Sequence, residues 1–291
     1  MAEQRETFSA ATMPPSLADR EHGSTLVLFD VDGTLAVPAQ RADDAAVNML
    51  GALRERYAVG IVGAGDFEKQ TMQLHGDLHA RLDFVFSENG VHAFRGGECL
   101  HCKSIVEHLG EARWAKFEAT LERLLREARD EATALLRRAV GADGAAADVG
   151  GRGTFLERRQ CTVNICPIGR TPTLSKAERG AFDAADREAG LRTRLVAALN
   201  EEFGPATEFA LTFSIGGQIG IDCCPVGWDK TFCLRFVPEG EFPTVHFFGD
   251  KTEPGGGDHE IFVHPRTVGH AVASPADTVA QVASIFGLAT R

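Results

Sequence analysis

Two carboxylates stand two positions apart at the end of an apolar run. In the stretch LVLFDVDGTLAVP, four apolar residues lead directly into Asp30, and Asp32 follows after one valine. Successive side chains of a β-strand point to opposite faces, so both carboxylates are expected on one face at the end of a buried strand. Two carboxylates this close repel each other unless a cation lies between them. Oxygen ligands favour Mg²⁺, and the pair therefore predicts a magnesium site.

A third carboxylate is expected beside this pair. Asp250 ends the apolar run TVHFFGD and opens the glycine-rich stretch FFGDKTEPGGGDHEIF. Parallel sheets bind ligands at the carboxyl ends of their strands, where Asp250 would join the pair. Beside a bound cation, one ionised aspartate can attack phosphorus while another moves the proton of a hydroxyl group. We expect Asp30 to be the nucleophile and Asp32 the acid/base. The non-functional alternative is a surface turn with Asx capping.

Strand-like and helix-like segments alternate at both ends of the chain. Residues 25–29, 58–65 and 84–86 are short apolar runs with helical patterns between them. This alternation is typical of a parallel sheet covered by helices. In the middle of the chain, a long amphipathic helical region is followed by alternating, hairpin-like segments. The sequence thus predicts an α/β fold, in which a doubly wound parallel-sheet core carries an inserted α+β cap domain.

The expected domain boundaries lie where these patterns change. We expect the core to comprise residues 24–90 and 223–291, and the cap to comprise residues 91–222. Residues 1–23 are polar and contain prolines, which predicts a disordered N-terminal extension. Residues 141–153 are small and glycine-rich, which predicts a loop, with 141–151 as an insertion.

The composition limits the possible partners. The chain of 291 residues has a formal net charge of −11, from 41 acidic and 30 basic residues. This charge gives no general attraction to nucleic acid or to anionic membranes. No apolar run reaches the roughly 20 residues of a membrane-spanning helix, and the N-terminus lacks the apolar region of a secretory signal. We therefore expect neither nucleic acid nor a membrane as a partner.

The seven cysteines indicate a reducing compartment. Their number is odd and their spacing matches no small disulfide framework, so we expect free thiols and a cytoplasmic protein. Cys99 and Cys102 form a C-x-x-C pair that could suggest zinc. A structural zinc site needs about four ligands, and the chain has no second pair of this kind.

Several motifs together carry a family resemblance. FDVDGTL resembles the nucleophile motif of the haloacid dehalogenase-like phosphotransferases, and motifs spread over about residues 25–290 resemble the eukaryotic-type phosphomannomutase family. Only the N-terminal extension and the region around 125–150 look unlike this family. The motifs that support this resemblance occur in the family's order: VGAGDFEKQ, SENG, RGTFLE, NICPIGR, TFSIGGQI, GWDK and FFGDKTEPGGGDHEIF.

The resemblance implies a reaction and its participants. Members interconvert mannose 6-phosphate and mannose 1-phosphate through a hexose 1,6-bisphosphate and so supply GDP-mannose synthesis. Asp30 would be the nucleophile and a Mg²⁺ ligand, with Asp250 as a further ligand. Asp32 would be the acid/base and would touch the metal through its backbone carbonyl, and Lys230 would offset charge on the transferring phosphoryl group. A homodimer through the cap is also implied, with Phe155 in the strand involved.

The resemblance also implies a substrate-binding set in a cap that closes over the sugar. A mutase must hold the distal phosphate while the other phosphate reacts, and planar guanidinium groups suit this task because each can bond two phosphate oxygens. Asp222 would accept from sugar hydroxyls. The residues carried over are Arg159, Arg170, Arg179, Gln218, Gly220 and Asp222.

Four positions depart from the family pattern. Ala39 stands where the family has an arginine, and Gly65 replaces a serine whose hydroxyl would bind phosphate. Gly220 replaces another serine. His264 replaces an aspartate in a loop that holds a second cation in the family, where Phe262 and Thr267 still match. The predicted Mg²⁺ ligands are untouched by these changes.

Two alternative functions remain open at this point. A Mg²⁺-dependent sugar-phosphate phosphatase would share Asp30 and Asp32, with water in place of the sugar hydroxyl. A catalytically weakened regulatory homologue would account for Ala39, Gly65 and Gly220, although it would have little reason to keep the aspartates. The sequence does not distinguish mannose from glucose phosphates, because the two differ in the orientation of one hydroxyl.

Overall fold

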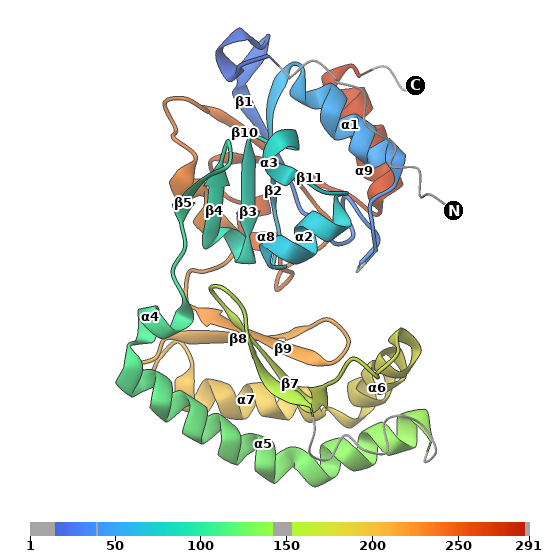
Figure 1. The fold of residues 1–291 in the computed structure, drawn as a ribbon, viewed down its shortest axis with the longest axis vertical. Coiled ribbons are helices and arrows are strands. Elements are labelled where there is room, and N and C mark those ends of the chain that lie inside the picture. The colour runs from blue at the N-terminus through green and yellow to red at the C-terminus, as the bar shows by residue number, and fades with distance from the viewer. Residues whose placement is uncertain (1–14, 39, 142–152, 289–291) are drawn as a thin grey trace, which may run out of the picture. The chain divides into compact units, whose positions relative to one another are not determined.

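The chain folds into two compact units (Figure 1). The core unit consists of residues 1–100 and 233–291, and the cap unit consists of residues 101–232. The structure is a computed structural model, and the residues that it describes are 15–38, 40–141 and 153–288.

The core unit is built on a seven-stranded sheet in the order β11-β10-β1-β2-β3-β4-β5. Every pairing from β11 to β3 is parallel, and β4 pairs antiparallel with β3. This confirms the predicted parallel-dominated α/β sheet. The strands are β1 (His22–Phe29), β2 (Tyr57–Val62), β3 (Phe84–Ser87), β4 (His92–Arg95), β5 (Glu98–His101), β10 (Thr244–Gly249) and β11 (Thr267–Ala271).

Alternation in the central strand separates two apolar layers. Val27 and Phe29 of β1 face one layer, and Leu26 and Leu28 face the other. In Figure 1, α1 and α9 lie side by side over one face of this sheet. The helices of the core unit are α1 (Asp44–Arg54), α2 (Phe67–Gln73), α3 (Leu78–Arg81), α8 (His259–Phe262), α9 (Pro275–Phe286) and the short 3₁₀ helices η1 (Leu17–Asp19) and η2 (Glu88–Gly90), while the 3₁₀ helix η4 (Lys230–Phe236) crosses the boundary between the units.

Side-chain caps fix where three core helices begin. Asp43 accepts a hydrogen bond from Ala46 N at the start of α1, and Asp66 accepts one from Lys69 N at the start of α2. Ser274 caps α9 in the same way. Each such cap satisfies a backbone donor that has no partner within its helix, and is worth about 1 kcal/mol.

The cap unit is a four-stranded antiparallel sheet with helices on one face. The strand order is β6-β7-β9-β8. Ile165 and Ile221 of the sheet lie in one apolar cluster with Phe117 and Leu199 of the helices, so the opposite face of the sheet is left to polar residues. The elements are α4 (Ile105–Leu109), α5 (Glu111–Val140), β6 (Thr154–Arg158), β7 (Val163–Arg170), α6 (Lys176–Ala189), α7 (Leu191–Phe203), β8 (Leu211–Gly216) and β9 (Gly220–Pro225).

The units divide later along the chain than the sequence pattern predicted. The division falls at 101 and 232 instead of 91 and 222. The hairpin of β4 and β5 extends the core sheet, because β4 pairs with β3. At the other boundary, β9 pairs with β7 and β8 and so belongs to the cap. An alternating pattern indicates a hairpin but not the sheet that it joins.

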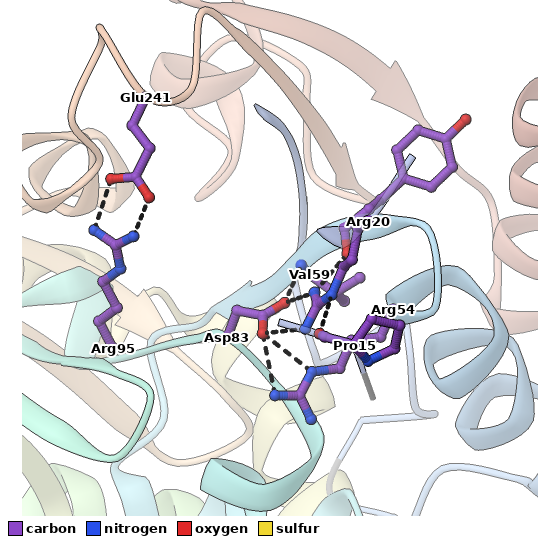
Figure 2. A network of polar contacts seen from close by, with 8 residues as sticks. Pro15, Arg20, Arg54, Val59, Asp83, Arg95 and Glu241 are labelled. Atoms are coloured by element: carbon purple, nitrogen blue, oxygen red, sulfur yellow. Dashed lines mark hydrogen bonds and ion pairs between the residues drawn. The ribbon is translucent and has the colours of Figure 1, made fainter. Parts of the chain in front are cut away.

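The N-terminal segment is more ordered than predicted. Residues 1–14 lie outside the described residues, but residues 15–23 form η1 and the start of β1, which corrects the expectation of disorder through 23. Arg20 fixes this segment, because its guanidinium donates to Asp83 Oδ2 at 2.6 Å (Figure 2). It also donates to Tyr57 O at 2.8 Å. Nothing in the sequence pairs Arg20 with an acid 63 positions away.

The Asp83 carboxylate is shared by two cationic side chains. Its Oδ1 accepts from Arg20 and Arg54 at 3.0 and 3.1 Å, and its Oδ2 accepts from Val59 N at 2.9 Å (Figure 2). Removing one partner of a buried pair costs about 3–5 kcal/mol, because it leaves an uncompensated charge. By contrast, the exposed pair of Arg95 and Glu241 in Figure 2 is expected to contribute about 1 kcal/mol or less.

The residues predicted to form the loop at 141–153 lie largely outside the described residues, which exclude 142–152. None of the helices formed by the described residues combines the length and the apolar character that spanning a bilayer requires.

Candidate active site

Three carboxylates meet at the carboxyl end of the core sheet. Asp30 follows β1 directly, and Asp250 follows the adjacent parallel strand β10. Each of Asp30, Asp250 and Asp258 offers an oxygen that lies within 4.8 Å of the oxygens of the other two. The pairing of β1 with β10 sets this proximity, because Asp30 N donates to Phe248 O at 2.9 Å.

The cluster has the chemistry of a divalent-cation site. Asp30 and Asp258 are buried, at 5% and 1% exposure, and Asp250 is half-buried. Three carboxylates in so small and dry a space repel one another strongly unless a cation neutralises them. An all-oxygen donor set fits Mg²⁺. Of the predicted metal residues, the structure therefore brings together Asp30 and Asp250.

Two glycines make room for these carboxylates. Gly33 has φ +94°, and a Cβ at this position would lie 2.5 Å from Asp250 Cγ. Gly249 acts similarly toward the third acid, because a Cβ there would lie 2.7 Å from Asp258 Oδ2. The glycine of the D-x-D-G motif is thus required both for the turn of the chain and for the close approach of Asp250.

Asp258 was not among the residues predicted from the sequence. Its carboxylate accepts a hydrogen bond from Lys251 N at 2.9 Å, which holds it across the loop that Asp250 opens. The sequence carried one usable signal: Asp258 is the acid that follows the glycine run in EPGGGDHE. A consecutive glycine run lets a chain fold back, and it therefore favours contact between the acids on its two sides.

Asp32 is held by helix α2. Its carboxylate forms an ion pair with Lys69 Nζ and accepts from Gln73 Nε2 at 2.8 Å. Lys69 and Gln73 are four residues apart and so share one face of the helix. The Asp32 side chain is about one-third exposed, at 32%, so the ion pair is open to solvent screening and serves orientation more than stability.

Gly65 lies next to the side chain of Lys69, which forms the ion pair with Asp32. A Cβ at Gly65 would lie 3.0 Å from Lys69 Cδ, a contact that the flexible lysine stem could relieve by shifting. The departure from serine at this position therefore removes a hydroxyl and leaves space that the stem of Lys69 occupies. Ala39, the other departure in the core, lies outside the described residues. Lys230 is buried, at 5% exposure, at the first residue of η4.

A polar row runs straight across the helix-free face of the cap sheet. The strand registers place Glu157 opposite Asn164, Asn164 opposite Asp222, and Asp222 opposite Ser214. Because paired residues point to the same face, one side chain from each strand joins this row. We call these four residues the cap polar row.

Asn164 connects two of the predicted substrate residues. Its Nδ2 donates to Asp222 Oδ1 at 2.8 Å, and its Oδ1 accepts from Arg170 Nη2 at 2.7 Å. The amide orientation is fixed by its partners, since a guanidinium can only donate and a carboxylate can only accept. Asn164 is 2% exposed, which makes these bonds costly to lose.

The acids of the row lie next to two arginines. Arg159 Nη1 is 3.4 Å from Asp222 Oδ1. Arg170 Nε lies 3.0 Å from Glu157 Oε2, close enough for an ion pair although not aligned for a hydrogen bond. The structure therefore brings Arg159, Arg170 and Asp222 together, and adds Asn164 and Glu157, which the sequence did not single out.

Gly220 permits the position of Asn164. A Cβ at Gly220 would lie 2.6 Å from Asn164 Nδ2 and 2.7 Å from its Oδ1. A side chain at 220 would therefore displace the buried amide that orients Arg170 and Asp222. In this chain, glycine in place of serine at position 220 leaves the space that the Asn164 amide occupies.

Arg179 and Gln218 come from neighbouring segments. Gly180 on α6 is next to Arg179, and a Cβ there would lie 3.1 Å from Gln218 Nε2. Buried Arg192 supports the turn that carries Gln218, because its Nη1 donates to Gly217 O at 3.2 Å. Among the described residues, the buried Nε of Arg179 has no hydrogen-bond partner.

The cysteines of the cap sheet are neutral thiols. Burial raises the pKa of the Cys166 and Cys224 thiols to about 11. Burial also raises the pKa of Cys223 well above its usual value. A thiol with such a pKa is neither nucleophile nor metal ligand at neutral pH, so the polar chemistry of the cap sheet rests on its guanidinium, amide and carboxyl groups.

The loop after α8 gathers carbonyl oxygens around Thr267. The Thr267 hydroxyl lies 2.5 Å from Ile261 O and 3.0 Å from His264 O. His264, which replaces the family's aspartate, accepts from Arg266 N through Nδ1 at 3.2 Å. The histidine therefore contributes to the internal bonding of this loop.

Comparison with known proteins gives one family. A sequence model described as "Eukaryotic phosphomannomutase" matches residues 46–128 and 148–288. The phosphomannomutase of Saccharomyces cerevisiae is 42% identical over 271 residues, which are 93% of this chain and 98% of the yeast protein. The phosphomannomutase of Galdieria sulphuraria is 42% identical over 264 residues, which are 91% of this chain and 95% of that protein.

Solved structures share the fold at low sequence identity. The C-terminal domain of C. albicans trehalose-6-phosphate phosphatase has a TM-score of 0.56 and 14% identity, with 94% of this chain and 96% of that chain covered. A trehalose-6-phosphate phosphatase related protein has a TM-score of 0.51 and 16% identity, with 90% and 96% covered. These likenesses concern the fold alone and agree with the predicted haloacid dehalogenase-like core with a cap. From its sequence, the chain belongs to the eukaryotic phosphomannomutase family.

Proposed function

We propose that this protein is a phosphomannomutase, an isomerase that interconverts mannose 6-phosphate and mannose 1-phosphate. The observation that carries the proposal is the clustering of Asp30 with Asp250 and Asp258 at the edge of the core sheet. Family membership supports the reaction class. Arg159 beside Asp222 and Arg170 beside Asn164 supply guanidinium groups for a second phosphate, which a phosphatase that acts on a single phosphate would not need.

The phosphoryl group passes through Asp30. One carboxylate oxygen of Asp30 takes the phosphoryl group from a hexose 1,6-bisphosphate, which leaves as a monophosphate. A hydroxyl of the next hexose monophosphate then attacks the aspartyl phosphate, so that a new bisphosphate forms and the Asp30 carboxylate returns. No free phosphate is released in either step.

Asp32 moves the proton of the reacting hydroxyl. Lys69 and Gln73 hold its carboxylate from one side, which fixes its orientation for proton transfer. Lys230 offsets negative charge on the transferring phosphoryl group. We assign these roles from the positions that the family motifs occupy.

The acidic cluster suits Mg²⁺. We propose Asp30, Asp250 and the backbone carbonyl of Asp32 as its ligands, with Asp258 as a further carboxylate of the cluster. When bound, Mg²⁺ neutralises the clustered carboxylates and the charge on the phosphoryl oxygens. A second cation is proposed at the loop of Phe262 and Thr267, where carbonyl oxygens already converge.

The cap polar row and its arginines bind the sugar phosphate. Arg159, Arg170 and Arg179 hold the phosphate that is not reacting, since guanidinium groups pair with phosphate in bidentate geometry. Asp222 accepts from sugar hydroxyls. The buried Nε of Arg179 supports this assignment, because it is a donor without a partner among the described residues. Gln218 and Gly220 complete the proposed set.

The wider setting follows from the same family. We propose that the product supplies GDP-mannose synthesis in the cytoplasm. All seven cysteines lie within the described residues and are free thiols, which supports this proposal. A homodimer through the cap is proposed at β6, which is an edge strand of the cap sheet and carries Phe155.

One coupled assay tests the proposed reaction. The protein is supplied with mannose 1-phosphate, MgCl₂ and a catalytic amount of hexose 1,6-bisphosphate, and mannose 6-phosphate and inorganic phosphate are followed together. The proposal predicts isomer without release of phosphate. Phosphate release without isomer would identify a phosphatase, and neither product would identify a regulatory homologue.

A further inference from the structure

Two thiols that the proposed reaction does not use lie close together in the cap unit. The Sγ atoms of Cys102 and Cys161 are 3.9 Å apart. Cys102 is exposed in the segment between β5 and α4, and Cys161 is fully buried in the turn between β6 and β7. The backbone also joins these segments, because Ile105 N donates to Cys161 O at 2.8 Å.

We propose that Cys102 and Cys161 form an oxidative modification site, at which a hydroperoxide converts the two thiols into one disulfide. A disulfide has an S–S length of about 2.05 Å, so the sulfur atoms must approach by about 1.9 Å from their present 3.9 Å. Cys102 lies in an exposed segment outside any helix or strand, and this segment can supply the movement without disturbing the apolar core.

The chemistry takes two steps. The Cys102 thiolate attacks one oxygen of hydrogen peroxide, the O–O bond breaks, and a sulfenic acid forms, while the released hydroxide takes up a proton and becomes one water. The Cys161 thiolate then attacks the Cys102 sulfur, the S–S bond forms, and the hydroxyl leaves as a second water after taking up a proton. The two thiols lose two electrons and two protons in total, and the peroxide is reduced to two waters.

Exposure decides the order of these steps. Peroxide can reach the exposed Cys102, whereas Cys161 has no exposed surface. Cys99 is also exposed and belongs to the same C-x-x-C pair. Cys99 lies in the extended strand β5, so its Cα is about 10 Å from that of Cys102 if the segment stays extended, beyond the reach of a disulfide.

The site adjoins a proposed substrate residue. Cys161 lies within the tight turn closed by the hydrogen bond from Arg159 N to Thr162 O at 2.9 Å. Arg159 also contacts Asp222. Resting on the proposed function, we infer that the disulfide shifts this turn and raises the KM for mannose 1-phosphate several-fold, reversibly with dithiothreitol.

Peptide mapping tests the bond itself and needs no activity. The full-length protein and its Cys99→Ser and Cys102→Ser variants are treated with hydrogen peroxide, blocked with N-ethylmaleimide, and digested with trypsin without reduction. We expect a cross-linked peptide joining positions 102 and 161 in the wild type and in Cys99→Ser, and its loss in Cys102→Ser and after dithiothreitol. Fragment ions are required, because Cys166 shares a tryptic peptide with Cys161.

Three outcomes would overturn the proposal. They are a dominant bond between Cys99 and Cys102, a bond between two chains, or oxidation of Cys102 without any cross-link. Failure of the proposed mutase reaction would leave the mapped bond unaffected, so the two proposals fail separately. A mapped bond with an unchanged KM would contradict the inferred effect on Arg159.

Discussion

Gly33 and Asp250 approach so closely that no side chain fits between them. The carboxyl carbon of Asp250 would lie 2.5 Å from a Cβ at position 33, and Gly33 has φ +94°, a conformation that favours glycine. The residue that lets the chain turn after the two acidic residues therefore also sets the distance at which the third acid joins them.

We expect Gly33→Ala to weaken Mg²⁺ binding at least tenfold and to lower mutase activity by a similar or larger factor. The new methyl group displaces the Asp250 carboxylate, and backbone strain adds about 1–2 kcal/mol. Titration calorimetry with MgCl₂ measures the first effect. Gly76→Ala is the matched control, because Gly76 has φ +109° and open space around its Cβ position. If Gly33→Ala and Gly76→Ala lost Mg²⁺ affinity equally, the loss would be due to backbone strain and not to displacement of Asp250.

Asp258→Asn should have opposite effects with and without the metal. Without Mg²⁺, removal of one of three clustered charges relieves repulsion and raises the Tm. With Mg²⁺, the increase in Tm caused by the ion should shrink, because stabilisation by a ligand follows its affinity for the folded state. Glu260→Gln, in an exposed acid nearby, should change neither value. An unchanged Mg²⁺ response in Asp258→Asn would exclude Asp258 from the cation site.

Asn164→Leu tests the buried amide between Arg170 and Asp222. Its two hydrogen bonds to charged groups contribute about 1.5–3 kcal/mol each. We expect the KM for mannose 1-phosphate to rise at least tenfold with a smaller change in kcat, because the amide orients groups that bind the sugar phosphate. Asn200→Ala, on helix α7, should leave both constants unchanged. If Asn164→Leu lowered only Tm, the role of the amide would be structural.

The histidine pair of the core sheet predicts a loss of stability in acid. His246 Nδ1 and His270 Nε2 are 2.9 Å apart, and both rings stack at the β10–β11 pairing. Burial lowers the pKa of both residues below 6.5, and the neighbouring His270 lowers the pKa of His246 further. The unfolded chain therefore binds protons more readily, and the contribution of the pair is present above about pH 6.5 and is lost as pH falls toward the lowered values.

The pair is tested by the free energy of unfolding between pH 7.5 and 5.5. His270→Phe removes one titrating group and relieves the other, so its stability should fall less over this range than that of the wild type. His264→Phe serves as a comparison. His264 is partly buried, and no histidine among the described residues pairs with it. Parallel curves for wild type and His270→Phe would contradict the assignment.

The acidic site was largely predictable because its signals are local. A carboxylate directly after an apolar run lies at a strand end whatever the rest of the chain does, and parallel pairing then brings two such ends together, as for Asp30 and Asp250. Asp258 was missed because its approach depends on how a loop folds back over Gly249. The pairing of Asp32 with Lys69 was also missed, since it depends on which face of helix α2 is turned toward Asp32.

The fold class of the cap was predictable from the sequence, but the contacts among its site residues were not. The family resemblance indicated Arg159, Arg170 and Asp222, yet nothing in the sequence pattern connects them through Asn164, because that requires the register of β7 with β9. The ordered segment before β1 was missed for a similar reason. From the sequence alone, Arg20 resembles an exposed surface charge. Only the structure shows that it pairs with Asp83.

The most direct test of the account is to identify the phosphorylated residue. The protein is incubated with Mg²⁺ and hexose 1,6-bisphosphate, quenched, reduced with borohydride, which converts an aspartyl phosphate to homoserine, and sequenced by mass spectrometry. Asp30 and Asp32 share one tryptic peptide, from Glu21 to Arg41, so fragment ions must separate them. We expect homoserine at position 30 alone. Modification at another residue, or none while the isomerisation proceeds, would contradict it.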